Sequence, residues 1–400
     1  MKKILKDILI FVFVFAFVVL GVFGNGYFKE IKTHTLAFFQ NIKTDGFFLS
    51  FQKFTDSIDS ASSEKLSYHK DLVNVNSAFQ FLEGIRIVEK DGMTVVRAEN
   101  NYLSSIREKI ENSDLEKRAE NIEKLKNSAR ENGAEFLYIM APTKGYFSAY
   151  PENADDYNQS NCLRFLQFLD QKNVPYFNIM DQMELDGVRE EDMFFITDHH
   201  WRPEMAFWAL KKTLEHLDFP YDTEILNLGN YDVTTYDNWF LGSQGKKVGR
   251  YFTPKGTDEI KLILPKFKTD LTEEQPYKDL TRRGEFKDIL INLSFIENKD
   301  YYNLNPYAAY TGGDFKEQII TNHQNPNGKT VLVIRDSFAC AFTPFLSLAS
   351  YKTHILDMRD FPEFGNERID VAEYIKKTNP DYVLVLYTGV TASEILYQFE

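Results

Sequence analysis

The sequence predicts an α/β fold in which a parallel β-sheet is covered by helices on both faces. Two parts of the chain, residues 134–217 and 330–387, alternate short, continuous apolar runs with segments of helical length. Short apolar runs are typical of buried parallel strands, because both faces of such strands are covered. Strands that alternate with helices in this way are typical of α/β proteins.

Local signals along the chain define the predicted elements. Residues 79–96 alternate around Asp91-Gly92, which is typical of a hairpin with a tight turn. Ser113-Asp114 can cap a charged helix that Gly133 ends, and Pro203 suits the first turn of another helix. The predicted strands are residues 134–140, 174–179, 193–196, 330–335, 354–358 and 381–387. The predicted helices are residues 113–132, 156–172, 203–217, 338–349 with a bend at Pro344, and 368–378.

A different kind of segment separates the two alternating parts. Residues 220–310 are rich in Tyr, Asn, Gly and Lys and contain short alternating pieces such as 261–264. We interpret residues 220–320 as a β-rich insertion that separates two parts of one domain, and the alternative is a long excursion over the active-site face. The expected organisation is a membrane segment at 1–25, a stalk or lead-in at 26–70, the first part of the domain at 71–219, the insertion, and the second part at 321–400.

The amino terminus predicts a membrane anchor. Lys2, Lys3 and Lys6 precede an apolar run at residues 8–24, which as a helix rises about 25 Å, near the lower limit for a span. Lysines on the amino side place the amino terminus in the cytoplasm and the remainder outside. The alternative is a cleaved signal peptide, although no typical small-residue cleavage site follows. We therefore expect a single-pass anchor that carries an extracytoplasmic domain.

Composition excludes several classes of function. The formal net charge of −13 and the lack of a basic stripe with interleaved aromatics argue against nucleic-acid binding. Cys162 and Cys340 are the two cysteines, which is neither a disulfide framework nor a zinc set. Two buried free thiols are expected, and one bridge between them is the alternative. No cofactor or metal is expected.

The densest polar cluster predicts a catalytic base. Asp198 and His200 lie two residues apart, between an apolar run and the helix that Pro203 opens. A carboxylate so placed can fix the imidazole tautomer and stabilise the imidazolium that forms when the histidine takes a proton. Ser337 follows the predicted strand 330–335 and opens a helix, where backbone amides can meet an oxyanion. The alternatives are a core histidine, an aspartate that caps a helix, and an ordinary N-cap serine.

Several motifs resemble the DHHW protein family, which is related to the SGNH hydrolase-like proteins of alginate and polysaccharide O-acetylation. The matching strings are TDHHW (197–201), PTK (142–144), TGGD (311–314) and VIRDSF, which ends at Phe338. The resemblance covers roughly residues 70–400 and implies a permuted SGNH-hydrolase-like fold, in which the Asp-His pair precedes the serine. It implies that Asp198 orients, His200 is the general base and Ser337 is the nucleophile.

The resemblance also implies a reaction and its partners. The reaction is O-acetyl transfer to an exported or cell-surface polysaccharide, with acetyl supplied by a multi-pass membrane O-acyltransferase. With water as acceptor, the same site is an acetylesterase. The Gly-Asp-Ser found in many SGNH enzymes is replaced here by Arg335-Asp336-Ser337, which leaves the oxyanion donors open.

Further residues near these motifs are candidates for substrate or oxyanion contacts: His199, Trp201, Lys144, Tyr310, Gly313, Gln244 and Arg335. Each has an ordinary alternative. A loop lysine is commonly solvated, residues 242–245 suit a plain turn, and aromatic residues by default pack in the core. His199 is expected beside the base rather than as the base.

Two other classes of function remain open at this stage. One is a non-catalytic scaffold or binding subunit of a polysaccharide modification or export complex, which would show the same fold and anchor. The other is a metal-dependent phosphoesterase that uses Asp198, His199 and His200 as ligands. Such enzymes need further aspartates and histidines at strand ends, and the sequence offers no second aspartate–histidine pair.

Overall fold

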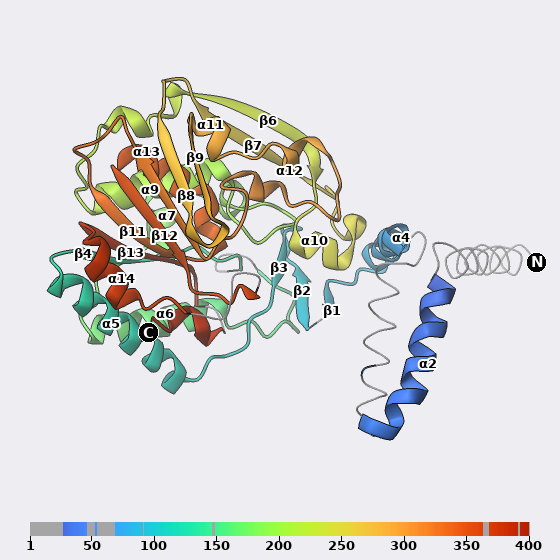
Figure 1. Ribbon diagram of the computed structural model, residues 1–400. Helices are drawn as coiled ribbons and strands as arrows, with labels where there is room; N and C mark the ends of the chain where they lie inside the picture. The colour runs from blue at the N-terminus through green and yellow to red at the C-terminus, as the bar shows by residue number, and fades with distance from the viewer. Residues whose placement is uncertain are drawn as a thin grey trace, which may run out of the picture. The chain divides into compact units, whose positions relative to one another are not determined.

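The computed structural model describes residues 27–45, 53, 69–90, 92–145, 149–362, 368–390 and 393–399. The chain divides into two compact units, Met1–Leu82 and Glu83–Glu400. The first contains helices α2 (Tyr27–Asp45) and α4 (His69–Leu82) (Figure 1). The predicted membrane segment, residues 1–25, lies outside the described residues. Among the helices that are described, none has the length and apolar character needed to cross a membrane.

The second unit is built on one eight-stranded sheet. Its strand order is β5-β4-β13-β11-β12-β10-β8-β9. The first five strands in this order run parallel, and the last three join antiparallel to their neighbours. The bounds are β4 Glu135–Ala141, β5 Tyr176–Asn178, β8 Leu271–Gln275, β9 Leu280–Gly284, β10 Glu317–Asn322, β11 Thr330–Arg335, β12 Lys352–Asp357 and β13 Tyr382–Thr388. The predicted α/β fold is confirmed, but the sheet is mixed rather than wholly parallel.

The three antiparallel strands come mainly from the region expected to be an insertion. In β8 and β10 buried and partly exposed residues alternate, whereas β11 and β13 are buried almost throughout. Burial alternates along a strand when one face of its sheet is less covered than the other. Antiparallel sheets commonly have one such face. Residues 220–320 therefore extend the main sheet in part. The remaining strands of this region, β6 (Tyr231–Phe240) and β7 (Asp258–Pro265), form an antiparallel pair of their own.

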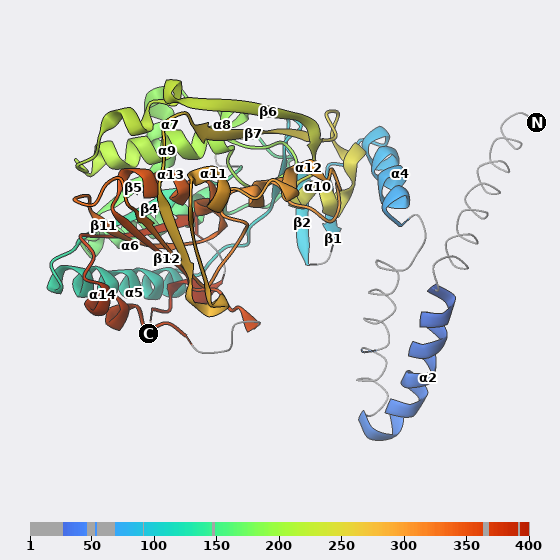
Figure 2. The same cartoon turned by 45° about the horizontal axis from the view of Figure 1, so that its top comes forward.

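Helices cover both faces of the sheet (Figures 1 and 2). Successive side chains of β4 point to opposite faces, so Leu137 and Ile139 pack in one core with α9 and α13, and Phe136 and Tyr138 pack in the other with α5, α6 and α14. The bounds are α5 Asn112–Glu131, α6 Asn158–Gln171, α7 Ile179–Asp186, α8 Glu190–Met193, α9 Pro203–His216, α10 Ser243–Val248, α11 Phe286–Ile289, α12 Ser294–Glu297, α13 Thr343–Ala349 and α14 Val371–Thr378.

A small three-stranded sheet precedes the main one. It consists of β1 (Ile87–Lys90), β2 (Met93–Arg97) and β3 (Leu103–Ser105). Strands β1 and β2 pair antiparallel across the predicted turn. The hairpin is therefore confirmed over its second half, while residues 79–82 belong to helix α4.

Two predicted elements near the motifs differ from the structure. Residues 193–196 are not a strand: Met193 ends α8, and Phe194 forms an isolated bridge with Trp201. This apolar run is buried because the loop folds back on itself. A buried loop has the same apolar composition as a buried strand, so a short run without periodicity does not distinguish the two. The predicted helix 338–349 is a 3₁₀ segment, η6 (Ser337–Ala341), followed by α13, which Pro344 opens rather than bends.

Candidate active site

The structure brings Asp198, His200 and Ser337 into one hydrogen-bonded chain. Asp198 and His200 lie on the loop between α8 and α9, and Ser337 follows β11 as the first residue of η6. His200 Nδ1 is 2.6 Å from Asp198 Oδ1, and His200 Nε2 is 2.8 Å from Ser337 Oγ. Asp198 and His200 are buried, while Ser337 is partly exposed. This order of contacts is that of a carboxylate–imidazole–hydroxyl triad.

Asp198 is held as an anion. Its Oδ1 also accepts the backbone N–H of His200 at 3.0 Å, and its Oδ2 accepts the N–H of Ser243 at 2.7 Å. Burial by itself raises the pKa of Asp198, but the neighbouring histidines and these hydrogen bonds outweigh it and hold the pKa well below 3.8. The carboxylate therefore keeps a proton on His200 Nδ1, which leaves Nε2 free to accept one from Ser337.

The loop that carries Asp198 is fixed from two sides. Asp258 of β7 accepts the N–H groups of Ile196 and Thr197, at 2.6 and 2.8 Å, and the Thr197 hydroxyl at 2.6 Å. Gly242 donates its N–H to Thr197 Oγ1 at 2.8 Å. A Cβ atom at Gly242 would lie 2.2 Å from Cβ of Asp198, so a side chain is excluded there.

The backbone around Ser337 leaves one amide for an oxyanion. Asp336 caps η6: its Oδ1 accepts the N–H of Phe338 at 3.0 Å, and its backbone carbonyl accepts the N–H of Ala339 at 3.2 Å. Within the described part of the chain, the Ser337 N–H has no protein acceptor. A free amide on the nucleophile itself is well placed to stabilise a tetrahedral oxyanion.

Lys144 is buried and not solvated. It lies just beyond β4, and its ammonium donates to the carbonyl of Leu103 at 2.7 Å and to that of Ile196 at 3.2 Å. Burial lowers its pKa from 10.5 to about 8, against the opposing effect of nearby Asp258 and Asp198. Lys144 therefore supports the loop two residues before Asp198 and does not contact Ser337 itself.

Three other sequence-predicted residues lie in the interior. Trp201 is fully buried, and its indole N–H donates to the carbonyl of Phe338 at 2.9 Å, which ties the His200 loop to the Ser337 segment. Tyr310 is also fully buried, and its hydroxyl donates to the carbonyl of Lys261, so it packs in the core rather than lining a groove. Gln244 is buried in α10 and donates to Ser105 Oγ at 3.2 Å.

Arg335 and Gly313 belong to a partly buried charge network around the end of β11. The Arg335 guanidinium pairs with Asp314 and Asp357, and it donates to the carbonyl of Gly313 at 3.4 Å. These contacts join the ends of β11 and β12 to the loop before β10. Cys340 lies 3.4 Å from the guanidinium; it and Cys162 are buried free thiols, as the sequence predicts.

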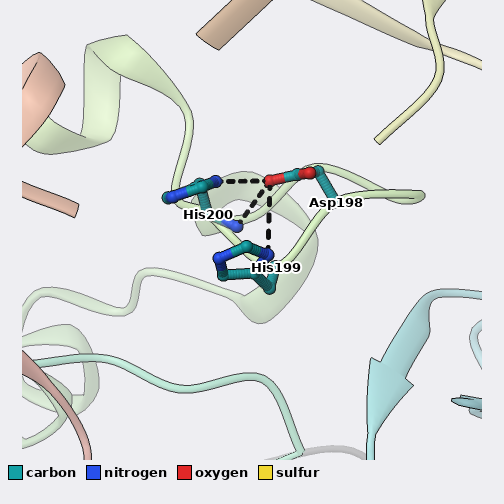
Figure 3. A group of neighbouring side chains, drawn as sticks. All are labelled: Asp198, His199 and His200. Atoms are coloured by element: carbon teal, nitrogen blue, oxygen red, sulfur yellow. Dashed lines mark hydrogen bonds and ion pairs between the residues drawn. The ribbon is translucent and has the colours of Figure 1, made fainter. Parts of the chain in front are cut away.

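His199 lies beside the base. Its Nδ1 is 2.8 Å from Ser243 Oγ and 3.8 Å from Asp198 Oδ1, and Figure 3 shows one carboxylate oxygen facing both imidazoles. Among the described residues, these three side chains form the one acidic and histidine group compact enough to hold a metal ion. Both nitrogens of His200 already have partners, Asp198 and Ser337. No further carboxylate of the described chain joins the group, which disfavours a phosphoesterase centre.

Comparisons with known proteins show a family likeness over part of the chain. Residues 100–235 match the family model described as the SGNH hydrolase-like domain of acetyltransferase AlgX. The matched stretch, 136 of the 400 residues, is similar to an SGNH hydrolase-like domain. This match includes Asp198 and His200 and stops short of Ser337. The resemblance indicated by the motifs is confirmed, while a search of curated proteins gives no match.

Solved structures share the fold over most of the chain. A structure of PatB1 from Bacillus cereus with a sulfonyl adduct is 23% identical with a TM-score of 0.62, and covers 79% of this chain and 99% of that one. A DHHW family protein from Eubacterium siraeum is 19% identical with a TM-score of 0.56, and covers 78% of this chain and 96% of that one. At these identities the likeness is one of fold.

Three residues that support the site were not found from the sequence. Ser243 belongs to residues 242–245, which were considered for an oxyanion contact through Gln244 or, alternatively, as a plain turn. Asp258 and Tyr307 lie in the region 220–320, and no local pattern marks them. Both act on the loop at 196–201 through contacts between residues far apart in the chain, so a single sequence holds no signal for them.

Proposed function

We propose that this protein is a membrane-anchored, extracytoplasmic O-acetyltransferase that modifies an exported or cell-surface polysaccharide. One observation carries the proposal: the continuous chain from Asp198 through His200 to the Ser337 hydroxyl, at 2.6 and 2.8 Å. The match to the domain of an acetyltransferase supports acetyl as the transferred group. The lysines and apolar run at the amino terminus support the anchor and the outward placement.

The first half-reaction acetylates the enzyme. His200 Nε2 takes the proton of Ser337 Oγ as this oxygen bonds to the acetyl carbonyl carbon. The Ser337 N–H stabilises the oxyanion that forms, and Asp198 stabilises the imidazolium. The bond to the donor then breaks, and the leaving oxygen takes the proton from His200. The acetyl group is now an ester of Ser337.

The second half-reaction transfers the acetyl group. A sugar hydroxyl gives its proton to His200 as its oxygen attacks the Ser337 ester, and Ser337 leaves with that proton. Water in place of the sugar makes the same site an acetylesterase. A multi-pass membrane O-acyltransferase supplies the acetyl group, because an active site outside the cell needs an acetyl donor that is brought across the membrane.

The experiment is covalent labelling of the full-length chain in detergent with a fluorophosphonate. We expect one adduct, mapped to Ser337 by peptide mass spectrometry, and we expect Ser337→Ala to lose both this adduct and cleavage of p-nitrophenyl acetate. Ser347→Ala is the matched control, because Ser347 is a buried hydroxyl ten residues further on that donates to the carbonyl of Pro344. It should label like the wild type.

Different outcomes separate the hypotheses. A wild-type chain that neither labels nor cleaves the ester contradicts a catalytic role and favours a scaffold. Loss of activity with a chelator revives the metal-dependent class. Transfer of acetyl to added oligosaccharide, measured by mass, distinguishes a transferase from an esterase.

A further inference from the structure

Tyr307 stacks on the imidazole of His200. It lies in the 3₁₀ segment η5 (Pro306–Ala309), and only 1% of it is exposed. The two ring centroids are 4.1 Å apart with an angle of 16° between the planes. The rings of His199 and Phe338 also approach His200, but at angles of 35° and 43°. Tyr307 is therefore the neighbour that lies almost parallel to the imidazole.

The hydroxyl of Tyr307 joins the two halves of the site. It donates to the carbonyl of Phe338 at 2.8 Å and accepts the indole N–H of Trp201 at 3.0 Å. Phe338 follows Ser337 in the chain, and Trp201 follows His200. The phenol thus reinforces the direct hydrogen bond from the Trp201 indole N–H to the Phe338 carbonyl, and so strengthens the link between the residues next to the base and next to the nucleophile. Burial raises the pKa of Tyr307 well above 10, so the phenol keeps the proton that it donates.

The charge that develops on His200 explains why an aromatic face matters. His200 becomes an imidazolium when it takes the Ser337 proton, and the face of an aromatic ring attracts a cation. Asp198 acts through Nδ1, in the plane of the imidazole, whereas Tyr307 acts on its face. The other titratable groups nearby are His199, in the same loop, and Lys144, which lies close enough to Asp198 to interact with its charge. Asp336 and Cys340, on the Ser337 side of the site, interact with Tyr307 itself.

We propose that Tyr307 is a positioning residue with two separable roles. Its hydroxyl sets the distance between His200 and Ser337, and its ring stabilises the imidazolium during proton transfer. The inference rests on the proposed function, because it assigns Tyr307 to the triad described above.

Two isosteric changes at position 307 separate the roles. Tyr307→Phe keeps the ring and removes the hydroxyl; a pentafluorophenylalanine at the same position keeps the shape and removes the attraction for a cation. The measurement is the rate of fluorophosphonate labelling of Ser337 in the full chain across the acid limb of the pH profile. For Tyr307→Phe we expect a rate about tenfold lower with an unchanged midpoint. For the pentafluorophenylalanine protein we expect the midpoint of the acid limb to lie about one pH unit below that of Tyr307→Phe.

Tyr310→Phe is the matched control. Tyr310 is equally buried, lies three residues away, and donates its hydroxyl to a backbone carbonyl outside the site. It should keep both the labelling rate and the midpoint. Equal midpoints for the Phe and pentafluorophenylalanine proteins overturn the role of the ring, and a wild-type rate in Tyr307→Phe overturns the role of the hydroxyl. A wild-type chain that does not label at all refutes the proposed function instead.

Discussion

The buried ammonium of Lys144 makes the stability of the folded unit depend on pH in a defined window. The side chain is 3% exposed, and burial lowers its pKa from 10.5 to about 8. The difference between a pKa of 10.5 and one of about 8 corresponds to about 3 kcal/mol. That is the free energy by which folding disfavours the protonated lysine relative to the neutral one. Replacement by methionine, which has similar length and no charge, removes the effect.

The sign follows from which state binds the proton. Between pH 8 and 10.5 the unfolded chain keeps a proton on Lys144 that the folded chain has released. In that window the free energy of unfolding rises with pH by about 1.4 kcal/mol per unit from this group alone. This gain in stability is complete above the pKa that Lys144 has in the unfolded chain. It is lost as the pH falls through the pKa that Lys144 has in the folded chain.

The assay is urea unfolding followed by tryptophan fluorescence. All three tryptophans, Trp201, Trp208 and Trp239, lie in the unit Glu83–Glu400 and report on it. We expect the difference in unfolding free energy, wild type minus Lys144→Met, to rise by about 3 kcal/mol from pH 8 to pH 10.5. Every other titrating group is common to both proteins and cancels.

Lys126→Met provides the matched control. Lys126 is also buried and donates to two backbone carbonyls, those of Lys172 and Asn173, on the opposite face of the sheet. Because Lys126→Met also removes a buried ammonium and its hydrogen bonds to carbonyls, it shows what that loss alone costs in stability. Parallel pH curves for the wild type and Lys144→Met would refute the reasoning.

Two further predictions concern Asp198 and its surroundings. Asp198→Asn removes the charge that fixes the His200 tautomer, so kcat/KM for acetyl ester cleavage should fall by about 10⁴-fold while the fold, monitored by circular dichroism, is kept; an activity within tenfold of the wild type would contradict the triad. Gly242→Ala places a Cβ 2.2 Å from Cβ of Asp198 and should lower the Ser337 labelling rate about a hundredfold and cost about 1–3 kcal/mol. Gly284→Ala, whose Cβ would meet no atom closer than 3.6 Å, is the control and should change neither; equal behaviour of the two variants would exclude a steric role for Gly242.

Local patterns predicted the elements that position the triad. The strand at 330–335 was predicted with its observed bounds, because a run with both faces buried is apolar throughout. The helix that begins at Pro203 was predicted to within a residue at its end, since proline suits the first turn. The spacing of Asp198 and His200 was sufficient for their contact, which spans two residues and needs only a turn.

Tertiary structure determined the contacts that no local pattern contains. Strands β8 and β10, which lie toward one end of the sheet, escaped prediction because a strand covered less on one face has too few apolar residues to stand out. Lys144 was a candidate for a substrate contact, with a solvated loop position as the alternative. Its burial depends on two carbonyls and on Asp258, which lie far from it in the chain.

The amino-acid sequence by itself therefore determined the α/β pattern, the Asp198–His200 pair and the strand-to-helix corner at Ser337, because each depends on neighbours within a few residues. Only the folded chain decided that Ser337 lies 2.8 Å from His200 across 137 residues, and that Tyr307 stacks on the base. Such contacts depend on how strands order themselves in a sheet, and that order is a property of the packed core rather than of any single segment.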